Sequence, residues 1–371
     1  MRKLVATIIG LFIVGYTCCQ TPAAVNGLPN ASPGISRQQT ELIYEKSKSF
    51  PENTQLSVAI INSGVVKFFG IKRNNDTIQQ INNRHKIFEI GSISKVFTST
   101  LLASFVENGK LELNDPIQDF TDIEMNIGEK ITFKQLANHT SGLPRLPSNL
   151  NLLFVDPSNP YKNYDQKKLK EYLTEEMKLQ RSPGDGFEYS NLGAGLLGYL
   201  LAHISNKTYE ELLNEHIFSR YEMASSTTNR DEVKNRLIKG LDGKGDETSN
   251  WDLNVLVGAG GILSSANDLA RFALAQFDTN NTELNLTRQP TFTVSDQMQM
   301  GLGWHIIKAN NGKNEIFWHN GGTGGYTSSM ALDTENKHGI IILSNVSAFH
   351  QKTGKIDDLC FGLMNTLWKQ N

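Results

Sequence analysis

Apolar residues follow two different periods along this chain, and the change of period divides it into three parts. Near the N-terminus, two runs rich in β-branched and aromatic residues, Leu56 to Ile61 and Val65 to Ile71, are joined by the turn triplet Asn62-Ser63-Gly64. This arrangement predicts a β-hairpin. In the last third, β-rich runs predict strands over Gly303 to Lys308, Glu315 to Trp318, Ser328 to Asp333 and Ile340 to Ser344.

Apolar residues at helical spacing fill most of the chain between these strands. The pattern predicts helices over residues 39–49, about 92–106, 132–138, 166–179, 192–205, 209–217, 265–277 and 356–368. Ser265 and Asp268 have the spacing of a capping box at the start of one of them. Residues 147–164 and 278–294 are polar and predict irregular segments, and residues 74–83 predict a loop or a short exposed strand.

Strands at both ends with helices between them predict an α+β fold. We expect the two chain ends to pair into one antiparallel sheet flanked by helices, with an all-helical domain inserted in the middle. The sheet part would comprise residues 39–90 and about 300–371, and the mostly helical part about 91–299.

The N-terminus has the layout of a signal peptide. Arg2 and Lys3 precede an apolar run that ends at Val14, too short for a comfortable membrane span. We predict a signal peptide over residues 1–19, a flexible lead-in over 20–38, and a catalytic unit over 39–371. The protein is therefore expected to be exported, either periplasmic or secreted, and an N-terminal core helix or anchor is the alternative. Cys18 or Cys19 could carry a bacterial lipid anchor, but the residues before them match that processing pattern poorly.

Composition excludes several classes of function. The 371 residues carry 36 basic and 38 acidic side chains, so the net charge of −2 gives no electrostatic reason to bind nucleic acid. The eight histidines are scattered and form no His-Glu-x-x-His pair, so neither a metal nor another cofactor is expected. Cys360 would be the single thiol of the exported chain and could form no internal disulfide. We expect a monomer.

The first candidate for chemistry is Ser92, one helical turn before Lys95. Residues three apart share a helix face, so the serine hydroxyl and the lysine amine can meet. A serine at a helix start also lies among backbone N–H groups that no earlier carbonyl satisfies, and these can stabilise an oxyanion. The alternative is a capping serine beside an exposed lysine.

Two further elements carry polar groups at the edges of predicted elements. Tyr189-Ser190-Asn191 follows a turn and opens a helix, and the alternative is a half-buried tyrosine beside a helix cap. The run from His319 to Tyr326 follows a strand and contains four glycines, which let a ligand approach the backbone. Its alternative is a loose hairpin turn.

Together, in this order, the three elements resemble the active-site motifs of the penicillin-recognising serine hydrolases: Ser-x-x-Lys, Tyr-x-Asn, and the His-x-Gly variant of Lys-Thr-Gly. The stretch Phe88 to Lys95 looks like the class C β-lactamase signature. Stretches 138–144, 183–198 and 258–272 also match, so the resemblance implies a β-lactamase/DD-peptidase-like fold for nearly the whole mature chain. The implied roles are nucleophile for Ser92, proton transfer for Lys95 and Tyr189, substrate binding for Asn191, His319, Asn320 and Gly321, and an oxyanion hole from the N–H groups of Ser92 and Gly322.

Proton transfer requires unusual pKa values. Free lysine and tyrosine have pKa values of about 10.4 and 10, too high for bases at neutral pH. Burial would lower the pKa of Lys95, and a neighbouring cation would stabilise the Tyr189 phenolate. The resemblance favours Tyr189 as the base and as the later activator of the deacylating water, but the residues alone leave both candidates open.

The resemblance implies a serine hydrolase that acts on a small-molecule or peptidoglycan-derived substrate, foremost the cyclic amide of a β-lactam. His319 stands where class C β-lactamases typically have a lysine, and a histidine is mostly neutral near pH 7. A D-alanyl-D-alanine carboxypeptidase, a D-amino-acid peptidase and an esterase are therefore alternatives. From another class, a non-catalytic penicillin-binding-like scaffold protein also remains.

Lys352-Thr353-Gly354 spells the Lys-Thr-Gly motif literally. It follows the last predicted strand and leads into the terminal helix, whereas the functional triplet should lie on a strand with more strands to follow. We assign Lys352-Thr353-Gly354 to a surface loop.

Overall fold

The computed structural model describes residues 34–75, 77–309 and 312–369. The predicted signal peptide and most of the lead-in lie outside these ranges, as do Cys18 and Cys19. The first helix, α1 (Arg37–Ser47), begins two residues before the expected start of the catalytic unit.

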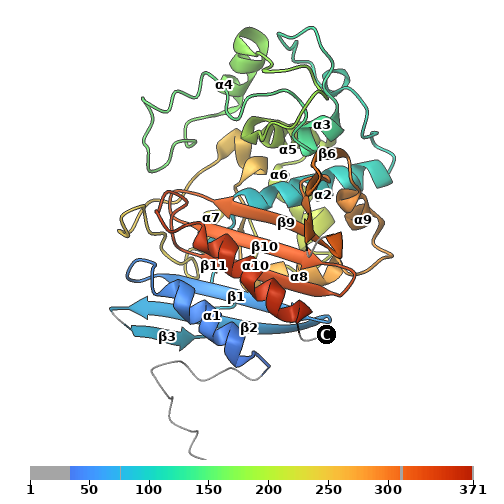
Figure 1. The fold of residues 1–371 in the computed structure, drawn as a ribbon. Helices are drawn as coiled ribbons and strands as arrows, with labels where there is room; N and C mark the ends of the chain where they lie inside the picture. Colours follow the sequence, from blue (N-terminus) through green and yellow to red (C-terminus); the bar gives the residue numbers. More distant parts are fainter. Residues whose placement is uncertain (1–33, 76, 310–311, 370–371) are drawn as a thin grey trace, which may run out of the picture.

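One antiparallel sheet dominates the described residues (Figure 1). Its nine strands lie in the order β3-β2-β1-β11-β10-β9-β8-β7-β6. They are β1 (Gln55–Asn62), β2 (Val65–Asn74), β3 (Thr77–Ile81), β6 (Phe292–Ser295), β7 (Met298–Met300), β8 (His305–Ala309), β9 (Asn314–Gly322), β10 (Thr327–Asp333) and β11 (His338–Ser344). Strands β1 and β11 pair in the middle, with Ile60 opposite Ile340, so the two chain ends join in one sheet as predicted.

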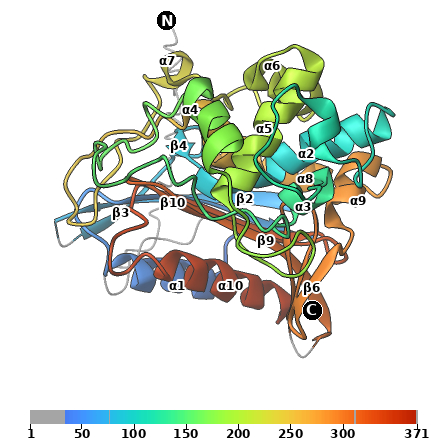
Figure 2. The same ribbon diagram turned by 90° about the horizontal axis from the view of Figure 1, so that it is seen from above.

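Helices cover both faces of the sheet. In Figure 2, α1 and α10 lie on one side, and α2, α5, α6 and α8 lie on the other. Beyond α1, the helices are α2 (Ser94–Glu107), α3 (Phe133–Ala137), α4 (Gln166–Glu171), α5 (Asn191–Ser205), α6 (Tyr209–Leu213), α7 (Arg230–Val233), α8 (Ala266–Ala275), α9 (Thr282–Arg288) and α10 (Lys355–Trp368). None of the helices in the described ranges is long and apolar enough to cross a membrane.

The central strands β1, β10 and β11 are buried along nearly their whole length because helices cover both faces of the sheet. In β1, Val58 and Ile60 pack with the core under α1 and α10, whereas Ala59 and Ile61 pack with the larger core under the other helices. Residues of opposite parity point to opposite faces of a strand, so one continuous apolar run serves two cores. Helix α2 is buried on nearly all sides although it carries polar residues; the hydroxyls of Thr98 and Thr100 donate to the helix's own carbonyls at Ser94 and Val96.

Three local predictions were wrong. Residues 278–294, expected to be irregular, contain helix α9 and strand β6, so the sheet resumes at Phe292 rather than near residue 300. The middle part is not entirely helical, since β5 (Leu263–Ser264) pairs with β4 (Phe88–Glu89). Ser265 does cap α8, but the Asp268 carboxylate accepts hydrogen bonds from Ser225 and Ser226 instead of completing a capping box.

Candidate active site

The nucleophile candidate lies on a tight turn that leads into the buried helix α2. Ser92 is the middle residue of the 3₁₀ turn Gly91–Ile93, and α2 begins at Ser94. The Nζ atom of Lys95 lies 2.9 Å from the Ser92 Oγ, so the predicted meeting of these two side chains is confirmed.

Lys95 is held in an apolar environment with few polar partners. Its side chain is 2% exposed, and besides Ser92 its Nζ contacts the carbonyl oxygen of Ala259, to which it donates at 2.6 Å. Burial lowers the pKa of Lys95 well below the usual value, and the positive charge of Arg145 lowers it further. The deprotonated amine, which can accept a proton, is therefore favoured far more than in a free lysine.

Tyr189 packs against the same lysine. Lys95 Nζ lies 4.9 Å from the centroid of the tyrosine ring, and the His139 ring lies 4.5 Å from it on a tilted plane. Burial raises the pKa of Tyr189 to about 12, although its hydrogen bond with Ser92 and the charge of Arg145 act in the opposite direction. The neutral phenol is favoured, contrary to the expectation of a stabilised phenolate.

Ser190 and Asn191 place Tyr189 at the start of α5. The Ser190 hydroxyl, not Asn191, caps this helix by accepting a hydrogen bond from the Gly193 N–H at 2.8 Å, and it donates to the Pro144 carbonyl at 2.7 Å. Asn191 is the first residue of α5 and its side chain lines the active-site cavity, where its Oδ1 is buried and accepts no hydrogen bond from the described residues.

Strand β9 passes so close to the nucleophile turn that only glycines fit. A Cβ added to Gly321 would lie 2.0 Å from the Ile90 carbonyl oxygen, and one added to Gly91 would lie 2.6 Å from the Gly322 nitrogen. Gly91 also has a φ of +52°, a left-handed conformation that favours glycine. The amide of Gly322 is therefore adjacent to the turn that carries Ser92, where the predicted oxyanion hole requires it.

His319 lies deeper than expected. We predicted that it lines the wall opposite the nucleophile, but it is 1% exposed and is not among the residues that line the cavity. Its Nδ1 contacts the carbonyl of Asn320 at 2.6 Å, and its Nε2 is buried without a partner among the described residues. Burial, followed by the charges of His305 and Lys95, lowers the pKa of His319 well below its usual value, so the ring is neutral.

A cavity of about 810 Å³ opens directly above Ser92. Its lining combines the expected residues Ser92, Tyr189, Asn191, Asn320, Gly321 and Gly322 with Arg145, Leu146, Leu152, Pro157, Pro160, Tyr161, Trp251, His305, Trp318, Thr327, Ala348, Phe349, Thr353, Gly354 and Asp357. The structure therefore gathers all predicted site residues on one cavity, with Lys95 and His319 just below its surface.

The literal Lys-Thr-Gly triplet lies in a surface turn before α10, so its assignment to a surface loop is confirmed. This turn also borders the active-site cavity. Thr353 and Gly354 line the cavity, and the Thr353 hydroxyl is 2.9 Å from that of Thr327 on β10. Because α10 packs on β10 and β11, its preceding turn reaches the end of strand β9, which the order of elements along the chain does not reveal.

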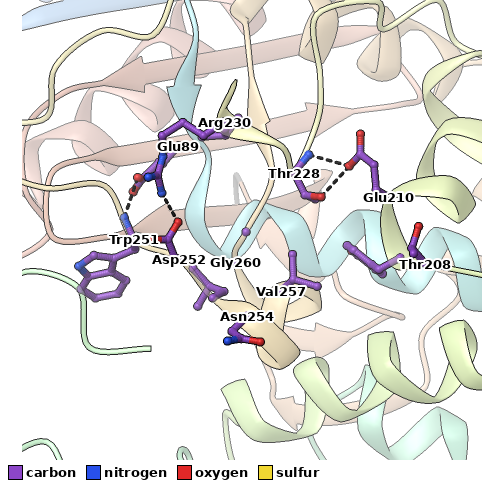
Figure 3. A pocket seen from close by; sticks show the side chains of 14 residues that line it. Glu89, Thr208, Glu210, Thr228, Arg230, Trp251, Asp252, Asn254, Val257 and Gly260 are labelled. Atoms are coloured by element: carbon purple, nitrogen blue, oxygen red, sulfur yellow. Dashed lines mark hydrogen bonds and ion pairs between the residues drawn. The ribbon is translucent and has the colours of Figure 1, made fainter. Parts of the chain in front are cut away.

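A buried carboxylate, Glu89, contacts Trp251, one of the residues that line the active-site cavity; Figure 3 shows this contact from the side of a second cavity. Glu89 accepts hydrogen bonds at its Oε1 from the Asn250 amide at 2.7 Å and from the Trp251 N–H at 2.9 Å. Trp251 lines the active-site cavity on one side and, on the other, a second cavity of about 400 Å³ that Glu89 and Arg230 share. Burial raises the pKa of Glu89 above its usual value.

Sequence reasoning missed two residues that hold Tyr189. His139 accepts a hydrogen bond at Nδ1 from the Ser190 N–H at 3.2 Å, and the guanidinium of Arg145 lies 5.1 Å from the Tyr189 ring centroid. Both flank or belong to the matching stretch 138–144, which was the available signal. Among the described residues, no three His, Cys, Asp or Glu side chains are grouped so that they could hold a metal ion.

Comparisons with known proteins agree with this geometry. A family model described as Beta-lactamase matches residues 51–359. The chain is 26% identical over 334 residues to "D-alanyl-D-alanine-carboxypeptidase/endopeptidase AmpH" of Escherichia coli (strain K12), covering 82% of this chain and 84% of that protein. It is 25% identical over 346 residues to a "Beta-lactamase" of Pseudomonas fluorescens, covering 83% and 93%.

A solved structure supports the fold. The crystal structure of a beta-lactamase/D-alanine carboxypeptidase from Yersinia pestis, complexed with citrate, superposes with a TM-score of 0.73 at 22% identity and covers 88% of this chain and 96% of that chain. This likeness shows that the sheet and helical part have the β-lactamase/DD-peptidase arrangement. Since the family model also spans well over half of its residues, the chain belongs to the beta-lactamase family of serine hydrolases.

Proposed function

We propose that this protein hydrolyses an amide or ester of a carboxylic acid through an acyl-enzyme on Ser92. The observation that carries the proposal is the 2.9 Å contact between Ser92 Oγ and a lysine amine whose pKa burial lowers, at the floor of an open cavity. The family and the names of its relatives make the cyclic amide of a β-lactam, or an amide of a peptidoglycan-derived peptide, the first substrates to test.

In the acylation step, Lys95 accepts the proton of Ser92. The Ser92 oxygen attacks the carbonyl carbon while its proton passes to the neutral Lys95 amine. The negative charge that develops on the carbonyl oxygen is stabilised by the N–H groups of Ser92 and Gly322. The bond to the leaving nitrogen or oxygen then breaks, and that atom takes up the proton that Lys95 received, relayed through the Tyr189 hydroxyl, which is protonated at neutral pH. Lys95 thereby returns to its neutral form.

Hydrolysis of the acyl-enzyme reverses these roles. A water molecule attacks the ester carbon and its proton passes to Lys95 directly or through Tyr189. The ester bond then breaks, and the Ser92 oxygen takes this proton from Lys95 and leaves as the alcohol, which restores the starting state. The pKa directions thus favour Lys95 over Tyr189 as the acylation base, opposite to what the resemblance implied, because burial shifts both groups toward their neutral forms.

A second candidate is an esterase or D-amino-acid peptidase of the same family. The observation that favours it lies at the third motif, where His319 is buried and neutral and so supplies no cation for the carboxylate that penicillins and cephalosporins carry. Export, a possible lipid anchor and the monomeric state stay predictions from the sequence.

The test is covalent labelling. We expect a fluorophosphonate probe and a penicillin each to add their mass to the intact protein, with the modified peptide containing Ser92. Ser92→Ala should add no mass, and Ser94→Ala, on the same turn but buried and hydrogen-bonded to Ile262 N–H, should still be labelled. Intact-protein mass spectrometry measures both.

Two outcomes would count against the proposal. A wild-type protein that stays unlabelled by both probes would favour the non-catalytic scaffold. Labelling that persists unchanged in Ser92→Ala would mean that another nucleophile is at work.

A further inference from the structure

One end of the active-site cavity carries a carboxylate, that of Asp357, which belongs to none of the three sequence motifs. Asp357, in the first turn of α10, is half-buried and lines the cavity. Its Oδ2 accepts a hydrogen bond from the Asn320 side-chain amide at 2.8 Å. Its Oδ1 is buried. Asn320 is the middle residue of the third motif, so this carboxylate is part of the wall that a substrate meets.

A helix dipole alone does not account for this placement. A carboxylate near a helix N-terminus is stabilising, and Asp357 and Asp358 both lie there. Asp358, however, points to the surface, where it pairs with Lys46 at 3.0 Å with 61% of its side chain exposed. Both acidic residues lie in the first turn of α10, but only Asp357 lines the active-site cavity. The helix dipole therefore does not explain why Asp357 faces the site.

Among the described residues His319 to Gly322, the third motif offers no cationic side chain to a substrate carboxylate. The Nδ2 of Asn320 directs one of its two N–H groups to Asp357. His319 is buried and uncharged. Among the described residues that line the cavity, Arg145 is the cationic one, and it lies over the Tyr189 ring rather than beside Asn320.

The rest of the cavity suits an apolar group. Tyr161, Trp251 and Phe349 form an aromatic row, with ring centroids 5.3 Å apart for the first pair and 6.2 Å for the second. Leu152 lines the cavity as well, and both it and Phe349 are exposed at its mouth, at 51% and 69%. Exposed apolar side chains that border a cavity commonly mark a ligand site.

We propose that Asp357 is a specificity-determining residue that disfavours substrates with a carboxylate next to the scissile bond and favours those with a neutral or ammonium-bearing leaving group and an apolar acyl group. The inference rests on the proposed function of Ser92. A carboxylate placed beside Asp357 is repelled and also loses its hydration, whereas an ammonium is attracted. Burial raises the pKa of Asp357, and the hydrogen bonds from Ser329 and Asn320 work in the other direction by stabilising its ionised form.

Three matched esters test this inference. Phenylacetate esters of 3-hydroxybenzoate, 3-hydroxybenzamide and 3-(aminomethyl)phenol share the acyl group and differ in the charge of the leaving group. In the wild type we expect kcat/KM for the carboxylate ester to be at least about tenfold below that for the amide ester, with the ammonium ester the fastest. In Asp357→Asn the ratio of amide to carboxylate ester should fall to within about threefold.

The matched control is Asp358→Asn, which removes the same charge one residue away. It should keep the wild-type ratio, because Asp358 faces solvent and Lys46. A bulk effect of net charge would instead change the ratio equally in both variants and would overturn the inference. If Asp357→Asn does not fold, the wild-type protein alone still tests the inference. Equal kcat/KM values for its carboxylate and amide esters would contradict it.

Failure of this inference is distinguishable from failure of the proposed function. A protein labelled on Ser92 by fluorophosphonate whose ester preference is insensitive to Asp357 overturns only the role of Asp357. A protein that takes no label and turns over none of the three esters overturns both.

Discussion

Replacing Lys95 with methionine is expected to lower kcat/KM for any substrate by about 10³–10⁴-fold, because it removes the general base at Ser92 while keeping the length of the side chain. The Nζ of Lys95 is the one amine within hydrogen-bonding distance of Ser92 Oγ among the described residues. Rapid-quench or steady-state assays with a chromogenic β-lactam or ester measure the loss. Lys95→Arg should not restore activity, since guanidinium stays protonated at any pH the protein tolerates.

The pH dependence of stability gives an independent readout of Lys95. Its pKa in the folded protein is lowered, so between that value and the ordinary value of about 10.4 the unfolded chain binds more protons than the folded chain. The free energy of unfolding therefore rises with pH in that window, by at most about 1.4 kcal/mol per pH unit. Wild type should gain stability relative to Lys95→Met as the pH is raised, which denaturant unfolding at two pH values measures.

Lys110→Met is the control for both measurements. Lys110 is exposed and lies just beyond the end of α2, so its loss should change neither kcat/KM nor the pH dependence of unfolding by a measurable amount. Acylation that survives in Lys95→Met at more than about a tenth of the wild-type rate would contradict the assignment of Lys95 as base and return that role to Tyr189.

The sequence was most informative where the chemistry depends on local spacing. Ser92 and Lys95 are three residues apart on a helix start, so their contact follows from helix geometry alone. The pairing of the two chain ends in one sheet could also be predicted, because β-rich runs lie at both ends and the intervening chain is mostly helical.

The predictions failed where structure depends on distant partners. Strand β6 has only four residues and is half-exposed, so its alternating run Phe292–Ser295 is too short to stand out from the polar segment around it until β7 pairs with it. His319 directly follows a predicted strand, which led us to expect it on the cavity wall opposite Ser92. Instead, Tyr189 and His305 pack around the His319 ring and bury it. Asp357 has the sequence context of an ordinary helix-terminal acid, and only the packing of α10 against β10 brings it to Asn320.

Gly321→Ala is expected to lower kcat/KM by about 10²–10³-fold, which is the cost of losing one oxyanion-hole donor. Its Cβ would lie 2.0 Å from the Ile90 carbonyl oxygen, a contact that no rotamer change can relieve because the backbone fixes the positions of both atoms. Strand β9 must therefore move away from the nucleophile turn and carry the Gly322 amide with it. The Ile90 carbonyl is itself held by the Ser328 hydroxyl at 2.8 Å, so the turn is not free to follow.

The same clash should destabilise the fold, by about 1–3 kcal/mol or somewhat more, as overpacking typically does. Thermal unfolding separates the two effects, since activity measured well below the unfolding midpoint reports geometry rather than the fraction folded. Gly128→Ala is the matched control: its added Cβ meets nothing within 4 Å, and its backbone needs no positive φ, so stability and activity should both be retained. If Gly321→Ala unfolds at a lower temperature yet keeps full activity while folded, the Gly322 amide does not contribute to the oxyanion hole, and the stabilising donors must be sought elsewhere around Ser92.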